Sequence, residues 1–285
     1  MTARILESGY RRYEGERRGE LHAVWSLFVH SLRRMLGLRR PARWKILPVM
    51  TIVFAYLPAI VFLGVIALLG DRVQDFVPQY ADYYGFIVSA IVLFVAFAAP
   101  EALCPDRRSH VLSLYLASPL TRGTYLLAKA MAVATIIAAV TVGPPLLLLV
   151  GRVLQEAGPD GPLGVLGVLG RIIGAGTALS LFYTALSLAI SSLTDRRAVA
   201  AAGTLMMILA SAIATNILYF GLDLPPEVLV LNLPFAPGEM VVRIYGEAGE
   251  VPALDTLALA AGLLALTVVS ASVTFWRYQS LRVTR

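Results

Sequence analysis

Six separate stretches of this chain are apolar over the length that a helix needs to cross a lipid bilayer. A spanning helix requires about 20 apolar residues, because each residue adds about 1.5 Å along the helix axis. The stretches are residues 46–69, 83–103, 124–150, 172–193, 198–220 and 256–276. Hydrophobic residues make up 58% of the 285 residues and charged residues only 15%. The sequence therefore predicts an all-α integral membrane protein, with six transmembrane helices in one domain over residues 46–276.

Basic residues are distributed unevenly among the segments between these stretches. Lys and Arg in short loops mark the cytoplasmic side of a membrane. The first 46 residues contain eleven of the 24 basic residues, and the loops opposite them contain only Arg72, Arg152 and Arg243 among many acids. Both termini are therefore predicted to be cytoplasmic, as a polar N-terminus at residues 1–19 and a tail at residues 277–285. Because topology accounts for the net charge of +6, we expect no nucleic-acid partner.

Residues 20–45 have the pattern of an amphipathic helix. Apolar residues recur at helical spacing from Leu21 to Leu36, and a cluster of Arg and Lys follows them. Such a helix lies in the headgroup plane, where anionic lipid attracts its cations. We predict an interfacial elbow helix that contacts membrane lipid and leads into the first span. A plain positively charged anchor is the alternative.

The longest loop on the predicted outer side, residues 221–255, is only partly polar. It contains two short apolar runs that begin with proline, and both are too short to span a bilayer. We predict a re-entrant outer segment between the fifth and sixth helices, since backbone at that depth must be buried in protein or line a wet cavity. Its candidate outer-gate residues are Pro234, Phe235 and Pro237, and a simple surface loop is the alternative.

Several classes of activity lack the residues that they need. The three histidines lie outside the apolar stretches, and neither HExxH nor GxSxG occurs, so the chain is not expected to be a metal- or serine-dependent hydrolase. A nucleotide-binding P-loop needs Gly-Lys-Ser/Thr, but the only lysines, Lys45 and Lys129, follow tryptophan and alanine. We therefore expect no catalytic residue, metal or cofactor on this chain. The lone cysteine, Cys104, cannot form an intrachain disulfide.

Two ionisable residues approach the hydrophobic zone near its predicted cytoplasmic edge. Glu101 lies at the end of the second stretch and Lys129 near the start of the third. We predict an inner-mouth polar network around them, in which Glu101 pairs with Lys129, Arg107 or Arg108. Capping or snorkelling at the interface is the alternative. The near absence of charge at mid-bilayer, where each group costs at least about 2.5 kcal/mol, argues against an ion-coupled carrier.

The segment between the second and third stretches contains a helix stop and restart. Residues 109–118 (SHVLSLYLAS) are compatible with a helix, and Pro119 prevents its continuation because proline pushes the preceding residue out of the α region. A short rigid element with apolar side chains at the cytoplasmic face is suited to docking a partner protein.

This segment resembles the one that follows the second helix in the membrane subunits of type-2 ATP-binding-cassette (ABC) exporters. The resemblance implies that residues 106–120 couple the permease to its ATPase, and we call them the coupling segment. The resemblance rests on Asp106-Arg107, Leu112, Leu114, Leu116, Ala117-Ser118-Pro119-Leu120-Thr121-Arg122-Gly123 and Leu127-Ala128-Lys129. The chain departs from the family pattern at Arg108, at His110 in place of glycine, at Val111 and at Ser113. Residues 190–198 and Leu233-Pro234-Phe235 are also similar to the family, so that the resemblance covers most of residues 20–276.

This resemblance implies a permease subunit that moves a substrate outward, using ATP hydrolysed by a separate ATPase. Mg-ATP would be bound by that partner, and two permease copies or paralogues would pair in the inner membrane of a prokaryote. The alternatives are a secondary transporter or channel that works without an ATPase, and a membrane scaffold or assembly protein. The residues implied for the ATPase contact are Asp106, Arg107, Arg108, Val111, Leu112, Tyr115, Leu116, Ser118 and Pro119.

Overall fold

The structure, a computed structural model, describes residues 19–38, 41–42, 45–70 and 78–281. The regular elements in these ranges are all helical, and six helices are long and apolar enough to cross a membrane. The spans are Ile46–Leu69, Tyr80–Arg108, Arg122–Leu154, Gly161–Leu193, Arg197–Gly221 and Thr256–Ser280. The predicted six-helix membrane fold is confirmed. The predictions for residues 1–18 and 282–285 lie outside the described residues.

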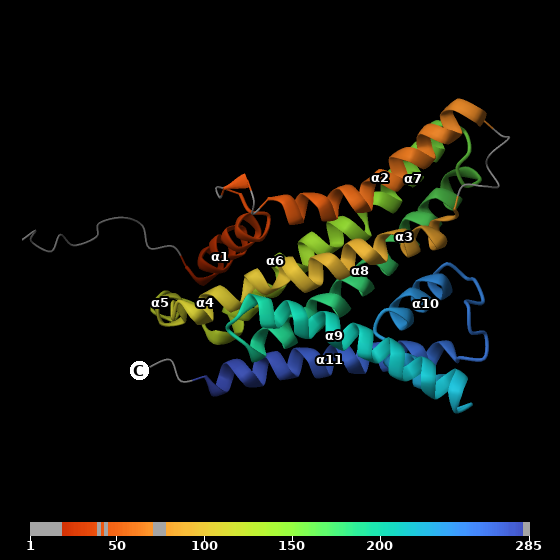
Figure 1. Cartoon of the computed structure of the whole chain (residues 1–285). Helices are drawn as coiled ribbons and strands as arrows, with labels where there is room; N and C mark the ends of the chain where they lie inside the picture. Colours follow the sequence, from red (N-terminus) through yellow and green to blue (C-terminus); the bar gives the residue numbers. More distant parts are fainter. Residues whose placement is uncertain (1–18, 39–40, 43–44, 71–77, 282–285) are drawn as a thin grey trace, which may run out of the picture.

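The spans run roughly along one axis, so that their ends gather at two ends of the bundle (Figure 1). We call the left-hand end in Figure 1 the near end. It contains the helices α1 (Glu20–Met35), α4 (Cys104–Arg108) and α5 (Leu112–Leu116), together with the carboxyl end of α11 (Thr256–Ser280). We call the right-hand end the far end, and it contains α10 (Phe235–Ile244) and the loops that flank it. Loop charges predict that the near end is cytoplasmic, and this orientation stays a prediction.

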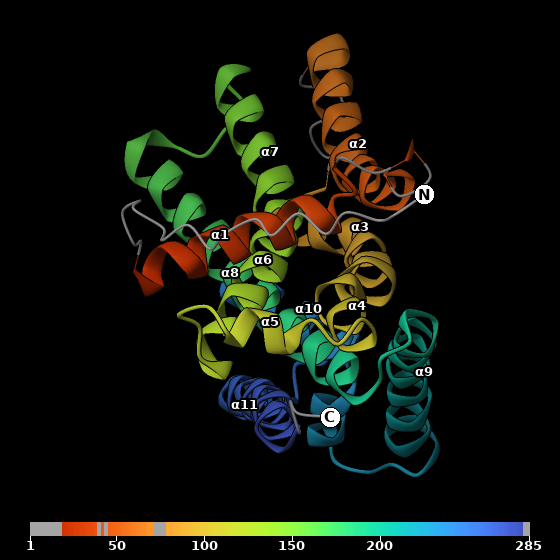
Figure 2. The ribbon, with the colours of Figure 1, turned by 90° about the vertical axis from the view of Figure 1, so that its left-hand side faces the viewer.

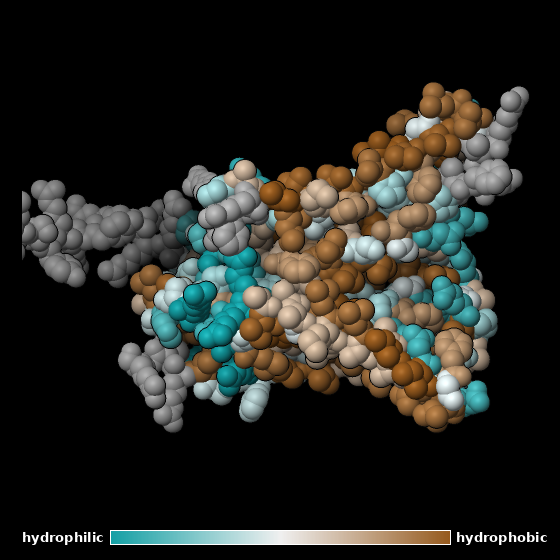
Figure 3. Space-filling view, in the orientation of Figure 1, coloured by the Kyte–Doolittle hydropathy of each residue, from teal (hydrophilic) through white to brown (hydrophobic). Residues whose placement is uncertain are grey.

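Hydrophobic side chains cover much of the outside between the two ends, and hydrophilic side chains gather at the near end (Figure 3). Exposed leucines, isoleucines and methionines are frequent on the spans, for example Ile60, Met206 and Leu264, which are 57%, 69% and 68% exposed. A surface of this kind is unfavourable in water and suits contact with lipid. The core of the bundle is close-packed around large buried side chains, among them Tyr83, Tyr125, Tyr183 and Tyr278.

The helix α1 packs across α6 (Arg122–Thr141) at the near end, as Figure 2 shows. Its buried side is the stripe Leu27, Ser31 and Met35, spaced four residues apart. Leu21 and Trp25 are 86% and 61% exposed. The helix thus has one face on the bundle and leaves apolar side chains outside, which is the arrangement that an interfacial helix needs. Its interfacial position stays a prediction.

The first span, α2 (Ile46–Leu69), bends part-way along its length (Figure 1). Pro58 has no N–H to donate to the preceding turn. Tyr83, from α3 (Tyr80–Leu93), inserts its hydroxyl at the bend. That hydroxyl accepts a hydrogen bond from the N–H of Ala59 (3.1 Å) and donates one to the carbonyl of Ala55 (2.5 Å). A proline together with an inserted side chain is a recognised cause of a helix kink.

The second span departs from regular α-helix as it approaches the near end. After α3 come a π-helical turn, η3 (Phe94–Ala98), a 3₁₀ turn, η4 (Ala99–Ala102), and then α4. Tighter and wider turns inside a helix change the direction of the side chains that follow. This unwinding places Glu101 and Asp106 inside the bundle, where they are 5% and 1% exposed.

The third and fourth spans pack closely together. The third consists of α6 and α7 (Gly143–Leu154), which are separated only at Val142. The fourth is the 33-residue helix α8 (Gly161–Leu193). Thr141 donates its hydroxyl to the carbonyl of Gly176 (2.9 Å). The missing side chain at Gly176 leaves room for the side chain of Val142 and for the backbone of Thr141. The break at Val142 thus lies directly against α8.

The connection between the last two spans folds back against the bundle. It follows α9 (Arg197–Asn216) and the turn η5 (Ile217–Gly221), and consists of the 3₁₀ turn η6 (Pro226–Leu231) and the helix α10. The Tyr183 hydroxyl donates to the carbonyl of Leu233 (3.3 Å), and the N–H of Leu233 donates to Ser211 (3.2 Å). Tyr183 lies ten residues before the end of α8, or about 15 Å along the helix. The start of α10 therefore contacts α8 well inside the helix, about 15 Å from its carboxyl end.

Candidate functional site

The coupling segment begins with a turn that ends α4. His110 has a backbone φ of 53°, in the left-handed region. The N–H of His110 bonds to the carbonyl of Arg107 (3.2 Å), and the N–H of Val111 bonds to the carbonyl of Asp106 (3.2 Å). These two bonds and the left-handed residue form a Schellman motif, which satisfies the last carbonyls of a helix. The turn gives α4 and α5 a fixed relative direction.

A helix stop and restart are present at the other end of the segment, but the helix is shorter than the predicted residues 109–118. The helix α5 ends at Leu116, and Ser118 donates its hydroxyl to the carbonyl of Tyr115 (2.5 Å). Thr121 then caps α6, because its hydroxyl accepts the N–H of Thr124 (3.2 Å) and its own N–H donates to the Thr124 hydroxyl (2.9 Å). Mutual capping of this kind fixes where a helix begins.

Two arginines, one in the coupling segment and one just after it, bind the ends of distant spans. Arg107 donates hydrogen bonds to the carbonyls of Ser192 and Thr194, the latter at 3.2 Å, where α8 ends. Arg122 donates to the carbonyls of Tyr278 (3.1 Å) and Gln279, where α11 ends. The last carbonyls of a helix lack partners within it and carry partial negative charge, so a cation stabilises them.

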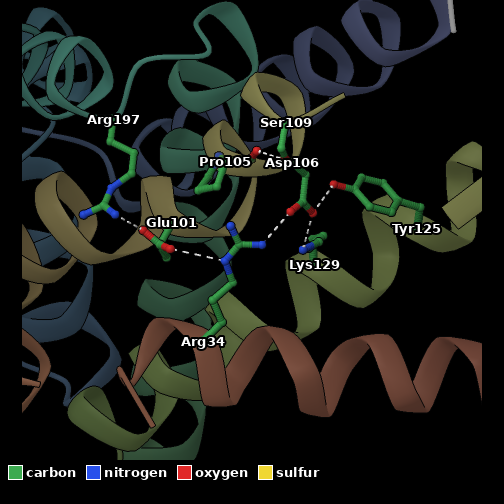
Figure 4. Close-up of polar contacts among 8 residues, drawn as sticks. All are labelled: Arg34, Glu101, Pro105, Asp106, Ser109, Tyr125, Lys129 and Arg197. Atoms are coloured by element: carbon green, nitrogen blue, oxygen red, sulfur yellow. Dashed lines mark hydrogen bonds and ion pairs between the residues drawn. The ribbon is translucent and has the colours of Figure 1, made fainter. Parts of the chain in front are cut away.

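A buried carboxylate lies at the centre of these contacts (Figure 4). Asp106 pairs with Lys129 from α6 at 2.7 Å and with Arg34 from α1 at 2.6 Å, and it accepts a hydrogen bond from the Tyr125 hydroxyl at 2.9 Å. The side chains of Asp106 and Lys129 are 1% and 0% exposed. Burial of these charges is tolerated because Asp106 and Lys129 form an ion pair and Asp106 is also hydrogen-bonded by Arg34 and Tyr125.

A second carboxylate extends the cluster to the fifth span. Glu101 pairs with Arg34 at 3.2 Å and with Arg197 at the start of α9. Arg34 therefore bridges Glu101 and Asp106, as Figure 4 shows. We call the set of Arg34, Glu101, Asp106, Tyr125, Lys129 and Arg197 the near-end ion network. It connects the elbow helix with the second, third and fifth spans.

The carboxylates hold Arg34 firmly in its charged form. Burial by itself lowers the pKa of Arg34, but the charges of Asp106 and Glu101 and their hydrogen bonds outweigh burial and raise the pKa above its usual value. An arginine at this position is thus a permanent cation. The positive charge of Arg34 is therefore constant in the physiological pH range.

Aromatic rings enclose the buried lysine. The Nζ atom of Lys129 lies 5.5 Å from the ring centroid of Tyr125 and 5.8 Å from that of Tyr115, which belongs to α5. The Tyr115 and Tyr125 centroids are 5.7 Å apart, and Tyr125 stacks on Tyr278 of α11 at 5.9 Å. Burial raises the pKa of the Tyr115 hydroxyl. The rings thus form a continuous path from the coupling segment through α6 to α11.

Comparison with known protein families gives a match that covers most of the bundle. A model described as "ABC-2 family transporter protein" matches residues 68–276, which is more than two thirds of the chain. The chain belongs to the ABC-2 transporter family. It is accordingly a transmembrane permease and a membrane transport component. Comparison with curated proteins finds no match.

The family match bears on the residues from the end of α2 to α11, and the elbow helix lies outside it. It includes the whole coupling segment of this ABC-2 protein. His110 occupies the position where the resemblance to type-2 exporters places a glycine. Its φ of 53° explains why glycine suits this position. Glycine adopts the left-handed region without strain, whereas other residues pay for it. The departure at His110 therefore keeps the backbone turn and adds a side chain.

The residues predicted to contact a partner divide into two groups in this ABC-2 protein. Asp106 and Leu112 are buried, and Arg107, Val111, Tyr115 and Leu116 are partly buried. Arg108, Ser118 and Pro119 are exposed. Leu114, which was not among the predicted contact residues, is 71% exposed and is the most accessible apolar side chain of the segment. The docking role of all these residues stays a prediction.

The polar residues predicted for the inner mouth, Glu101 and Lys129, do belong to one network. They are linked through Arg34 and Asp106. The sequence does not predict that Arg34 and Arg197 pair with Glu101, or that Asp106 pairs with Lys129. Arg34 is 67 residues from Glu101 along the chain, and no local pattern indicates a contact at that distance.

The predicted outer-gate residues lie together at the start of α10. Pro234 and Phe235 are partly buried and Pro237 is buried. Asn232 caps this helix by accepting the N–H of Phe235 at 3.1 Å. An apolar cavity of about 320 Å³ lies between α8, α10 and α11, and Pro237 is part of its wall. Their gating role stays a prediction.

Glu239 and Arg243 of α10 form a second buried ion pair. Their side chains are 1% and 9% exposed and lie 3.0 Å apart. Glu239 also accepts the N–H of Glu250 (3.0 Å), and Arg243 donates to the carbonyl of Val251 (2.9 Å) and to the Thr256 hydroxyl (2.7 Å). The pair therefore fastens the loop between α10 and α11. In the described part of the chain, no three His, Cys, Asp or Glu side chains gather as a metal site would require.

Proposed function

We propose that this chain is the permease subunit of an ABC exporter and that a separate ABC ATPase drives it from the near end. The ATPase would bind Mg-ATP and dock on the coupling segment, and a second permease copy or paralogue would complete the transport path. The near end would face the cytoplasm of a prokaryotic cell, with the bundle in the inner membrane. Substrate would leave at the far end, past the start of α10.

The observation that carries this proposal is the way the coupling segment is attached. Its exposed surface includes Leu114, and its buried surface is fastened to the bundle on several sides. Arg107 holds the end of α8, Arg122 follows the segment and holds the end of α11, and Asp106 holds α6 and α1. A displacement of the segment by a partner would therefore move the near ends of several spans together.

The near-end ion network is suited to transmitting movement between helices in such a mechanism. Charged groups in a buried site exchange partners only when the elements that carry them move, because an unpaired buried charge is costly. Arg34 contacts both Glu101 and Asp106, so α1 follows the second span. Arg197 contacts Glu101 and links the fifth span to the same point. Closure of the ATPases would change the spacing of these helices.

The connection before α11 supports a gate at the other end. The start of α10 contacts α8 about 15 Å from the carboxyl end of α8 and is hydrogen-bonded to both α8 and α9. A segment that enters a bundle to this depth can open or close a path between the spans. The Glu239–Arg243 pair would keep α10 in place when the gate is closed.

Purification of the tagged chain from native membranes tests the proposal. We expect an ABC ATPase with a Walker A motif to co-purify and to be identified by mass spectrometry. Leu114→Asp should weaken that association by about 10- to 100-fold, because burial of a leucine side chain contributes about 1.5–3 kcal/mol. Leu114 is preferable to Leu112, whose side chain is buried, because an aspartate at Leu112 would test folding instead.

The matched control is Leu222→Asp, which changes a leucine that is 62% exposed at the far end. This variant should retain the ATPase. Absence of any ABC ATPase from the purified wild type would contradict the proposal and favour an ATPase-independent transporter or a scaffold. Equal recovery of ATPase with Leu114→Asp and Leu222→Asp would contradict docking at the coupling segment.

A further inference from the structure

A polar cavity at the far end has no part in the mechanism described so far. Its volume is about 330 Å³, which falls within the roughly 300–1,000 Å³ of small-molecule sites. It lies between the start of α3, the connection from α7 to α8, α8 itself and the end of α10. Its polar and aromatic lining residues are Gln79, Tyr80, Arg152, Arg171, Tyr245 and Glu247. Figure 3 shows hydrophilic side chains at this end of the molecule.

The cavity lies at the level where lipid headgroups would be. Arg171 is 22 residues before Leu193, the end of α8, or about 33 Å along the helix. The hydrocarbon core of a bilayer is about 30 Å thick. If α8 crosses the membrane from its end at Leu193, Arg171 therefore emerges at the opposite headgroup region.

Arg152 is held in a fixed orientation at this cavity. Its Nη2 atom donates to the carbonyl of Pro78 at 2.8 Å, and its guanidinium carbon lies 5.0 Å from the ring centroid of Tyr80. The Nε atom of Arg152 is buried and forms no hydrogen bond with any group that the structure describes. A guanidinium that is oriented by a carbonyl and a ring keeps donors available for an incoming acceptor.

Arg171 adds a second cation without a compensating acid. It is exposed, and within the described ranges it forms no ion pair. Among the lining residues that the structure describes, Glu247 is the one acid, so these residues carry two positive charges and one negative charge. Arginine is rare in the segments predicted to be outer. Arg243, the other described arginine at this end, is already paired with Glu239.

We propose that this cavity is a binding site for a phosphate group, with Arg152 and Arg171 as its ligands. Guanidinium groups bind phosphate oxygens through paired, charge-assisted hydrogen bonds. A phosphate can come from the headgroup of a phospholipid in the adjoining leaflet or from free phosphate in solution. The site is independent of the coupling segment, so it does not depend on the ATPase.

Native mass spectrometry of the purified, delipidated chain tests this inference. The probe is short-chain phosphatidylglycerol, and the matching diacylglycerol without phosphate is the ligand control. We expect the wild type to bind one tightly held phosphatidylglycerol that Arg152→Gln/Arg171→Gln binds at least about tenfold more weakly. Arg108→Gln/Arg196→Gln removes two exposed arginines at the near end, outside the helix predicted to contact lipid, and should leave this binding unchanged.

Competition with inorganic phosphate identifies the source of the group. Displacement of the lipid by phosphate at similar concentration indicates a free-anion site, and failure to displace it indicates a headgroup site; both support the proposal. Equal binding by the wild type and the double variant would overturn it, and so would equal binding of diacylglycerol.

Arg152 also holds the backbone at Pro78, so its replacement could impair folding. Arg171→Gln alone then provides the test, because this side chain is exposed. It should weaken binding, and Arg171→Lys should restore part of the affinity since it restores the charge. Unchanged binding by Arg171→Gln would overturn the proposal.

Discussion

Replacement of Asp106 by asparagine would remove the carboxylate that pairs with Lys129 and Arg34 while keeping the size of the side chain. Arg34 would retain Glu101 at 3.2 Å. Lys129, whose side chain is 0% exposed, would lose its partner at 2.7 Å. The rings of Tyr115 and Tyr125 lie 5.8 and 5.5 Å from the lysine nitrogen in the wild type, so they add no new stabilisation of its charge in the variant. The variant therefore leaves a buried ammonium group uncompensated.

Loss of one partner of a buried ion pair costs about 3–5 kcal/mol, since the remaining charge stays out of water. For a chain of this size, about 1 kcal/mol corresponds to a change of about 2–4 °C in the unfolding midpoint. We therefore expect Asp106→Asn to lower the midpoint in detergent by roughly 6–20 °C. Asp195→Asn, which changes an exposed acid at the same end, should cost less than about 0.5 kcal/mol.

A compensating variant separates the buried charge from other effects of the substitution. Asp106→Asn/Lys129→Met removes both members of the pair, and neutral replacement of a buried pair is often tolerated. The double variant should recover most of the lost midpoint, as measured by thermal unfolding followed by size-exclusion chromatography. A single variant within about 2 °C of the wild type, or a double variant no better than the single, would refute the reasoning.

Two further substitutions test separate parts of the structure. His110→Val should lower the free energy of unfolding by about 1–2 kcal/mol, because a branched side chain is strained at a φ of 53°, whereas His110→Gly should be tolerated; equal thermal midpoints for the two would contradict the left-handed turn. Glu239→Gln leaves Arg243 without its acid and should cost about 3 kcal/mol, and hydrogen exchange at the Glu250 amide should become faster. Unchanged exchange in Glu239→Gln relative to the exposed control Glu227→Gln would show that the pair does not fasten this loop.

The spans could be predicted from the sequence because the bilayer imposes a simple length and polarity on them. The first predicted span, residues 46–69, agrees with α2. The fourth was expected from residue 172, but α8 begins at Gly161. The stretch before residue 172 is rich in glycine and contains Arg171, so its composition is a weak signal. Its backbone nevertheless continues the helix, which satisfies its own hydrogen bonds.

The partners within the near-end ion network could not be predicted, because they depend on how helices far apart in sequence are rotated against one another. Glu101 and Lys129 were expected to share a polar network from their positions alone. Their contacts with Arg34, Asp106 and Arg197 follow from the unwinding at η3 and η4 and from the placement of α1 on α6. Neither feature has a clear local pattern in the sequence.

The exposed face of the coupling segment was also beyond sequence reasoning. Leu112 and Leu114 are both leucines two positions apart, and a helix of five residues is too short for periodicity to indicate which of them is buried. The Schellman turn at His110 sets the rotation of α5, so that Leu112 packs inward and Leu114 is exposed. The stop at Pro119 was predictable, since it depends on proline alone.

Site-specific cross-linking from Leu114 tests the central claim most directly. The sequence has one cysteine, Cys104, and it is 0% exposed, so Leu114→Cys introduces an accessible thiol for a photoactivatable maleimide. In native membranes, we predict a cross-linked product with an ABC ATPase from Leu114→Cys and none from Leu222→Cys at the far end. Equal products from both positions, or no ATPase product from Leu114→Cys, would contradict the account.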